Sequence, residues 1–146
     1  MLRLKNKSKK KKSKLAAMGR RLITVSDSRS IIAEQFRTIR TNIKFSVPDT
    51  QLKTILVTSS TPGEGKSTTA ANLGVVFAQE GKKVLIVDAD MRKPTLHRTF
   101  GIFNTVGLST VLSKQNEFNS AIQETPIVGL FVLPSGPIPP NPAELL

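Results

Sequence analysis

The pattern of apolar and polar positions separates a polar N-terminal stretch from a body with helical and extended periodicities. Between residues 29 and 45, the apolar side chains recur at helical spacing, as Ile32, Phe36, Ile39 and Ile43. This spacing predicts an amphipathic helix with those four residues facing the core. Residues 54–59 and 84–87 are short apolar runs on either side of a helical pattern at 66–79. We therefore predict a βαβ unit, with its second strand covered on both faces.

Beyond this unit the pattern is less regular. Residues 108–112 and 118–122 resemble short helices, and residues 128–133 resemble another strand. A Pro-rich loop covers residues 135–142, and its end, Asn141-Pro142, is typical of a helix N-cap followed by proline at the first helical position. The length of 146 residues suits one domain. The fold class predicted is α/β, a mostly parallel sheet flanked by helices.

Charge is distributed unevenly along the chain. The formal net charge is +12, but residues 1–21 hold ten Lys/Arg and no acid, which leaves twelve basic and ten acidic residues in 22–146. We expect residues 1–21 to be a disordered basic tail and 22–146 to be the folded domain. The tail is either a solvated segment or, through residues 3–21, a contact for an anionic membrane surface. A nearly neutral body with few aromatic residues argues against nucleic acid as a partner.

Residues 60–68, with the sequence STPGEGKST, form the strongest chemical motif of the chain. They lie between a predicted strand and a predicted helix, and they match the phosphate-loop pattern G-x-x-x-x-G-K-[ST] with Ser60 in place of the first glycine. Backbone N–H groups of such a loop surround phosphates, the lysine reaches the β- and γ-phosphates, and the following hydroxyl binds Mg²⁺. The predicted nucleotide-binding residues are Pro62, Gly63, Glu64, Gly65, Lys66, Ser67 and Thr68.

A second motif follows the second predicted strand directly. Asp88 and Asp90 lie at the carboxyl end of that strand, where ligands bind in open α/β sheets. One carboxylate is suited to Mg²⁺ or its waters and the other to a substrate hydroxyl. The alternative is an acidic turn that ends the strand. Arg92 is suited either to stabilising phosphate charge or to tethering the loop.

Four blocks in order give the chain its resemblance to the bacterial tyrosine kinases of capsule and exopolysaccharide synthesis. Residues 60–68 and 84–92 are similar to the Walker A and Walker A′ motifs of that family. Residues 34–40 are similar to its E-x-x-R-x-x-R motif for ring-like self-association, and residues 136–146 to its Pro-rich block. The resemblance covers the chain from about residue 28 onward.

The resemblance implies a P-loop ATPase fold that transfers the γ-phosphoryl group of ATP to tyrosine hydroxyls with Mg²⁺. It implies that Lys66, Asp88 and Asp90 are the catalytic residues, that Ser67 and Asp88 hold the metal, and that Arg92 lies in the nucleotide site. It assigns subunit contacts to Glu34, Arg37 and Arg40. It further implies protein tyrosine substrates, a membrane-bound activator of the polysaccharide co-polymerase type, and a cytoplasmic location, peripheral at the inner face of the plasma membrane.

Two family features are missing from this sequence. The Walker B strand, an apolar run ending in Asp-x-x-Pro, is expected beyond the Pro-rich block, and the C-terminal tyrosine cluster has no counterpart because the chain has no Tyr. These departures predict a kinase domain truncated before Walker B, with an exposed apolar sheet edge and face. A non-catalytic nucleotide-binding fragment is the corresponding alternative.

A Min/Par-type partition ATPase is the other alternative with the same fold. Those proteins have a signature lysine at the position that Thr61 occupies here. Thr61-Pro62 and the E-x-x-R-x-x-R block both argue against that class. For Glu34, Arg37 and Arg40, an ordinary solvated helix face is the simpler reading, in which Glu34 and Arg37 pair within one helix.

Overall fold

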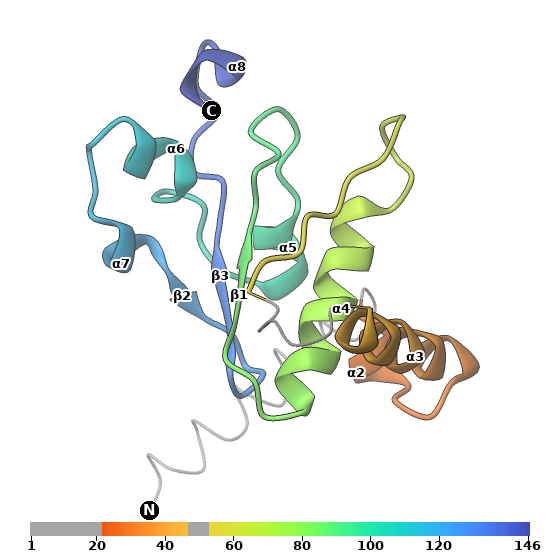
Figure 1. The fold of residues 1–146 in the computed structure, drawn as a ribbon. Helices are drawn as coiled ribbons and strands as arrows, with labels where there is room; N and C mark the ends of the chain where they lie inside the picture. Colours follow the sequence, from red (N-terminus) through yellow and green to blue (C-terminus); the bar gives the residue numbers. More distant parts are fainter. Residues whose placement is uncertain (1–21, 47–52) are drawn as a thin grey trace, which may run out of the picture.

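The structure is a computed structural model that describes residues 22–46 and 53–146. Among these residues, three strands form one mixed sheet in the order β1–β3–β2 (Figure 1). Strand β1 (Val84–Val87) pairs in parallel with β3 (Leu130–Leu133), with Val84 opposite Leu130. The two-residue strand β2 (Gln123–Glu124) pairs antiparallel with β3. The predicted α/β class is confirmed, with a small mixed sheet.

One long helix packs on the sheet, and two further helices pack on that helix. Helix α4 (Lys66–Gln79) packs on β1, while α2 (Ile23–Ser26) and α3 (Ile31–Phe45) contact α4 (Figure 1). Helix α4 approaches the sheet closely at Gly74, where an added Cβ would lie 2.6 Å from Cδ1 of Ile86. Only glycine fits that contact unless Ile86 moves. The core is therefore built where α4 meets β1 and β3.

The remaining helices are short and follow the strands. They are α5 (Leu96–Phe100), α6 (Leu108–Leu112), α7 (Phe118–Ala121) and α8 (Pro142–Leu145). Helix α5 adds Leu96 and the fully buried Phe100 to the core cluster. No helix of the described residues is long and apolar enough to cross a bilayer.

A buried hydrogen-bond network attaches α2 to α4. The backbone N–H and the hydroxyl of Thr24 both donate to Asn72 Oδ1, at 3.1 and 2.8 Å. Asn72 Nδ2 donates to the carbonyl of Thr68 at 2.9 Å, and Gln79 Nε2 donates to the carbonyl of Thr24 at 3.3 Å. Because Thr24 is fully buried and Asn72 is nearly so, these bonds satisfy polar groups that would otherwise destabilise the core.

The predicted amphipathic helix forms, but half of its apolar stripe is exposed. Ser30 accepts a hydrogen bond from the N–H of Ala33 at 3.2 Å and starts α3 at Ile31. Ala33 is buried, whereas Ile32 is 53% exposed and Ile39 is 44% exposed. The core prediction is therefore wrong for these two isoleucines. Among the described elements α3 contacts only α2 and α4 substantially, and two helical neighbours cover a narrower face than a full core would.

The predicted strand at residues 54–59 does not form. The segment is extended but joins no ladder with the residues that the structure describes, and Leu56 is 86% exposed. A strand needs a hydrogen-bonded neighbour, and β1 pairs with β3 along one edge only. Leu85 and Val87 are also exposed, so the expected coverage of 84–87 on both faces is wrong. The exposed apolar edge and face expected from the sequence are present.

Other predicted elements differ mainly at their boundaries. Helix 66–79, strand 84–87 and helix 108–112 are confirmed. Helix α7 ends at Ala121, and β3 begins at Leu130, just after Gly129 turns the chain at φ 80°. Pro142 begins α8 as expected, although the Asn141 side chain bonds to Glu144 instead of capping the helix. The predicted tail at residues 1–21 lies outside the described residues.

Candidate phosphate-binding site

The loop that precedes α4 depends on two glycines with left-handed backbone conformations. Gly63 has φ 85° and Gly65 has φ 87°. An added Cβ at either position would meet nothing within 4 Å, so the constraint is the backbone conformation and not space. Gly65 is the N-cap of α4, and its carbonyl accepts the first bond of the helix, from Thr69 N at 2.8 Å. The loop therefore ends at the N-terminus of a 14-residue helix, an arrangement that favours anions.

Lys66, the first residue of α4, is held back over the loop. Its ammonium nitrogen Nζ donates to Ser59 Oγ at 2.9 Å. The Ser59 hydroxyl in turn donates to the carbonyl of Thr61 at 2.9 Å. Sequence reasoning missed Ser59 because it precedes the phosphate-loop pattern.

The Glu64 carboxylate accepts a hydrogen bond from the backbone of the same loop. Its Oε2 accepts from the backbone N–H of Thr61 at 3.2 Å. Hydrogen bonds from the Thr61 side chain and backbone lower the pKa of Glu64, with further help from the charge of Lys66. The exposed carboxylate is thus stabilised in its charged form, as expected of a loop that attracts anions.

Asp88 lies directly after β1 and is only 3% exposed. Its Oδ1 accepts from Asp90 N at 3.2 Å, and its Oδ2 accepts from Thr95 N at 3.3 Å and Leu96 N at 3.1 Å. Burial raises the pKa of Asp88, and the three backbone bonds oppose that rise. In this structure the carboxylate therefore anchors the start of α5 to the end of β1.

Asp90 shapes the turn that follows. Its Oδ1 accepts from the backbone N–H groups of Arg92 at 3.2 Å and Lys93 at 2.9 Å. Asp90 and Arg92 are both exposed, unlike Asp88. The structure thus brings the two acids into one loop but gives them different environments: one is buried and fully bonded, and the other is open to solvent.

The residues present fit a magnesium nucleotide. Figure 1 shows the loop after β1 and the loop before α4 extending from the same end of the α/β unit. The part of the chain that the structure describes has no group of three or more His, Cys, Asp or Glu side chains suited to a metal. Mg²⁺ bound to a nucleotide needs only one or two protein carboxylates or hydroxyls, because phosphates and waters supply the other ligands. Ser67, in the first turn of α4, and Asp88 are groups of that kind.

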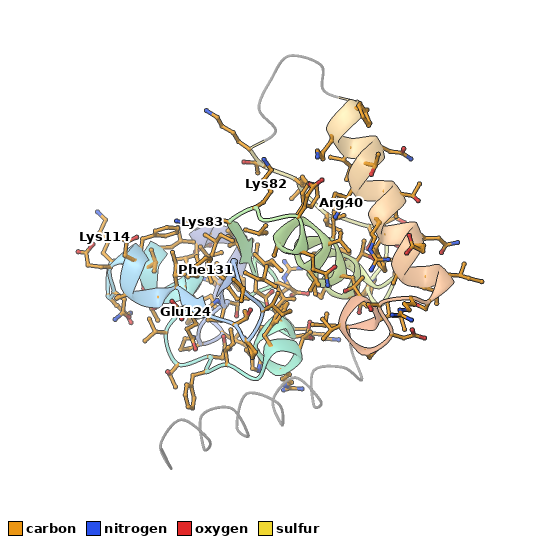
Figure 2. The ribbon with its side chains drawn as sticks, turned by 90° about the horizontal axis from the view of Figure 1, so that it is seen from below. Arg40, Lys82, Lys83, Lys114, Glu124 and Phe131 are labelled. Atoms are coloured by element: carbon orange, nitrogen blue, oxygen red, sulfur yellow. The ribbon has the colours of Figure 1, made fainter. Side chains whose placement is uncertain are left out.

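The Glu34, Arg37 and Arg40 side chains fall into two different environments. Arg37 pairs with Glu34, as predicted from their spacing, and donates to the carbonyl of Ser28 at 2.7 Å. Arg40, by contrast, donates to the carbonyl of Val76 on α4 at 2.7 Å, and its side chain is 17% exposed. Figure 2 shows Arg40 between α3 and α4. The structure separates Arg40 from the surface pair.

Glu80, at the C-cap of α4, completes the contact around Arg40. Its carboxylate bonds to Lys44 Nζ at 2.8 Å and lies 3.9 Å from Arg40 Nε. The bond to Lys44, with the charges of Arg40 and Lys44, lowers the pKa of Glu80. These basic side chains of α3 therefore hold the C-terminal end of α4.

The Pro-rich block begins in a closely packed turn after β3. Asn104 bonds to Gly136 through both its carbonyl and amide groups, each at 2.9 Å. Ser109 Oγ donates to the carbonyl of Pro137 at 2.7 Å. An added Cβ at Gly107 would lie 2.2 Å from the carbonyl oxygen of Pro134. The block is therefore fixed against α6 by contacts that its proline spacing did not predict.

Comparisons with known proteins decide the family. Residues 52–137 match the AAA domain family. The chain is 56% identical over 136 residues to tyrosine-protein kinase YwqD of Bacillus subtilis (strain 168), covering 93% of this chain and 57% of that protein. It superposes on the kinase domain of the Escherichia coli tyrosine kinase ETK with a TM-score of 0.81 at 35% identity, covering 85% of this chain and 49% of that one. The chain belongs to the bacterial tyrosine-kinase family.

A partition-type ATPase is also similar in structure to this chain, but less so than the tyrosine kinases. The septum site-determining protein MinD of Pyrococcus horikoshii, complexed with Mg-ADP, superposes with a TM-score of 0.53 at 31% identity, over 60% of this chain and 36% of that chain. Both the fold match and its extent are smaller than for the ETK kinase domain. The P-loop fold is thus shared by the two classes, and the bacterial tyrosine kinases are the nearer of the two. The chain spans about half of the YwqD and ETK chains that it matches.

Proposed function

We propose that this chain supplies the ATP-binding part of a bacterial protein-tyrosine kinase that regulates capsular or exopolysaccharide synthesis. The observation that carries the proposal is the Gly63–Gly65 loop, which is followed by Lys66 and Ser67 in the first turn of α4. This loop extends from the same end of the α/β unit as the loop after β1, which carries Asp88 and Asp90 (Figure 1). Family membership supports tyrosine as the phosphoryl acceptor. Because the chain spans 57% of the YwqD relative, we propose phosphoryl transfer for the longer kinase and nucleotide binding for this chain.

The proposed mechanism is positioning and charge stabilisation, as in other phosphoryl transfers. Loop N–H groups and Lys66 bind and orient the nucleotide phosphates, and Ser67 and Asp88 hold the magnesium ion. When bound, ATP with Mg²⁺ supplies the γ-phosphoryl group and the charge neutralisation that its transfer needs. Asp88 supports the metal and accepts the tyrosine proton at its carboxylate. Asp90 and Arg92 lie at the exposed part of the loop. Asp90 contacts the tyrosine acceptor, and Arg92 stabilises the negative charge of the phosphates.

The test is titration of the 146-residue chain with ATP and Mg²⁺ by isothermal calorimetry. We expect micromolar affinity for the unchanged chain and a loss of at least tenfold for Lys66→Met, because the charge that faces the phosphates is removed. A chain joined to the remaining part of its YwqD relative should phosphorylate a tyrosine copolymer, since this chain has no Tyr of its own. Phosphotyrosine that persists in Lys66→Met would contradict the mechanism.

A non-catalytic nucleotide-binding role is the second candidate. It is favoured by the bonding of Asp88, whose two oxygens are already used by three backbone N–H groups. ATP binding without phosphotyrosine in the joined kinase would favour this second role. Hydrolysis stimulated by a partner, again without phosphotyrosine, would instead indicate a partition ATPase.

We further propose the partners that the family resemblance implies. They are a membrane-bound activator of the polysaccharide co-polymerase type, protein tyrosine substrates, and other copies of the chain in a ring. The resemblance assigns the ring contacts to Glu34, Arg37 and Arg40, of which Glu34 and Arg37 form the surface pair. The corresponding location is the cytoplasm, at the inner face of the plasma membrane. Residues 3–21 would add attraction to anionic lipid, which a salt-sensitive sedimentation with anionic vesicles would test. Equal sedimentation with neutral vesicles excludes it.

A further inference from the structure

Ser59 lies one residue before the phosphate-loop motif and makes the hydrogen bonds that fix Lys66. Its hydroxyl accepts from Lys66 Nζ and donates to the carbonyl of Thr61, both at 2.9 Å. A serine hydroxyl has a single proton, and the Thr61 carbonyl takes it. The hydroxyl oxygen is therefore oriented with a lone pair toward the lysine ammonium.

Lys66 donates its hydrogen bond to the neutral hydroxyl of Ser59, although the carboxylate of Glu64 lies in the same loop. Glu64 bonds to the backbone N–H of Thr61, and among the ion pairs of the described residues none joins Glu64 to Lys66. A bond to a hydroxyl leaves the full charge of the lysine available, whereas an ion pair would have to be broken before a phosphate entered. An ammonium has three donors, so the bond to Ser59 leaves two for phosphate oxygens.

We propose that Ser59 is a positioning residue, which holds the Lys66 ammonium over the phosphate loop before the nucleotide arrives. This inference rests on the proposed nucleotide binding and extends it to a residue outside the motif. A free lysine side chain loses considerable rotamer freedom when it is ordered by a ligand. Ser59 imposes that order in advance, so that less binding energy is lost when the phosphates bind.

The decisive variants are Ser59→Ala and Ser59→Thr, with Thr58→Val as the matched control. The alanine removes the hydroxyl, the threonine keeps it, and the valine removes a neighbouring hydroxyl that makes no hydrogen bond with any described residue. We expect Ser59→Ala to weaken ATP binding by about fivefold to tenfold, the typical net effect of one hydrogen bond in a protein. Ser59→Thr and Thr58→Val should stay within about twofold, and all three should melt within a few degrees of the unchanged chain.

Two results would overturn the inference. Unchanged or tighter ATP binding in Ser59→Ala would mean that Ser59 restrains Lys66 away from the phosphates or has no influence on it. A loss of affinity that Ser59→Thr does not restore would mean that the site tolerates only serine for packing reasons. Recovery of affinity by the threonine is the outcome that a merely structural serine does not predict.

A second measurement keeps the inference testable if the isolated chain does not bind ATP, which would count against the proposed function and not against Ser59. The side-chain signals of Lys66 in the nucleotide-free chain, assigned by their loss in Lys66→Met, report the bond directly. We expect the two ε-methylene protons to be distinct in the unchanged chain and in Ser59→Thr, and to merge in Ser59→Ala. Identical signals in the unchanged chain and Ser59→Ala would contradict the proposed contact.

Discussion

At the scale of single residues, His97 gives the fold a dependence on pH. Its Nδ1 is buried and has no hydrogen-bond partner among the described residues. Burial, reinforced by the neighbouring charge of Arg98 and opposed by that of Asp88, lowers the pKa of His97 below its ordinary value. The folded chain therefore keeps this imidazole neutral at a pH where the unfolded chain protonates it. Stability is retained above about pH 6.5, the ordinary His pKa, and falls as the pH falls below it.

We predict that the urea midpoint of the unchanged chain falls between pH 7.5 and pH 5.5 and that His97→Asn has a smaller fall. The asparagine does not titrate, so the proton uptake that favours the unfolded state is removed. The carboxylates are common to both proteins and largely cancel in the comparison. Unfolding curves at the two pH values provide the measurement, and equal falls in the two proteins would refute the assignment to His97.

Site residues were predictable where the chemistry depends on a local pattern. The turn at Gly63 and Gly65 and the helix start at Lys66 are confirmed, because loop, glycine conformation and helix start are encoded within a few residues. Nucleotide binding by these residues stays a prediction. Ser59 and the burial of Asp88 were not found, because both depend on contacts between segments. The Asp88 bonds to Thr95 and Leu96 exist only once the chain turns into α5, a helix too short for periodicity to reveal.

At the scale of elements, Arg40 attaches α3 to the helix that carries the phosphate loop. It donates to the carbonyl of Val76 near the end of α4, where helix carbonyls lack partners. We predict that Arg40→Ala lowers the free energy of unfolding by about 1–2 kcal/mol, the cost of losing a largely buried bond from a charged donor. Arg37→Ala, which breaks the surface pair with Glu34, should cost less than about 1 kcal/mol.

Urea unfolding and sedimentation separate the two arginines. Arg37→Ala should alter self-association more than stability if the surface pair forms subunit contacts. Arg40→Ala should mainly alter stability, and Glu80→Gln should reproduce part of its effect because Glu80 faces the same side chain. Equal losses of stability for Arg37→Ala and Arg40→Ala would show that the two arginines do not differ in role.

Helices and strands were predictable from the sequence where the residues of a single segment determine its structure. Helix α4 keeps its predicted bounds because its N-terminal glycine and its apolar positions agree. The α3 stripe illustrates the opposite case: periodicity identified the helix, but the neighbours that cover it decide which of Ile32 and Ala33 is buried. The extended segment at 54–59 likewise has the composition of a strand, and only a pairing partner would make it one.

At the scale of the whole molecule, the described part of the sheet leaves apolar side chains in solvent. Leu56 is 86% exposed, Val87 44% and Leu85 37%, and β1 has a hydrogen-bonded neighbour along one edge only. An unpaired edge beside exposed apolar residues favours pairing with further polypeptide. Sheet topology therefore decides which apolar side chains of the described residues remain in solvent.

We predict that the chain associates as its concentration rises and that Leu56→Lys with Val87→Lys reduces this association. Each lysine places a charge on the exposed apolar surface, where dehydration on contact is costly, and replaces a side chain that contributes little to the core. Sedimentation velocity over a hundredfold concentration range gives the measurement, and urea unfolding checks that the double variant remains folded. Arg37→Ala provides the comparison, because it alters the α3 surface proposed for ring contacts and leaves the sheet unchanged. Association that responds to Arg37→Ala and not to the lysine pair would assign self-contact to α3 instead of the sheet.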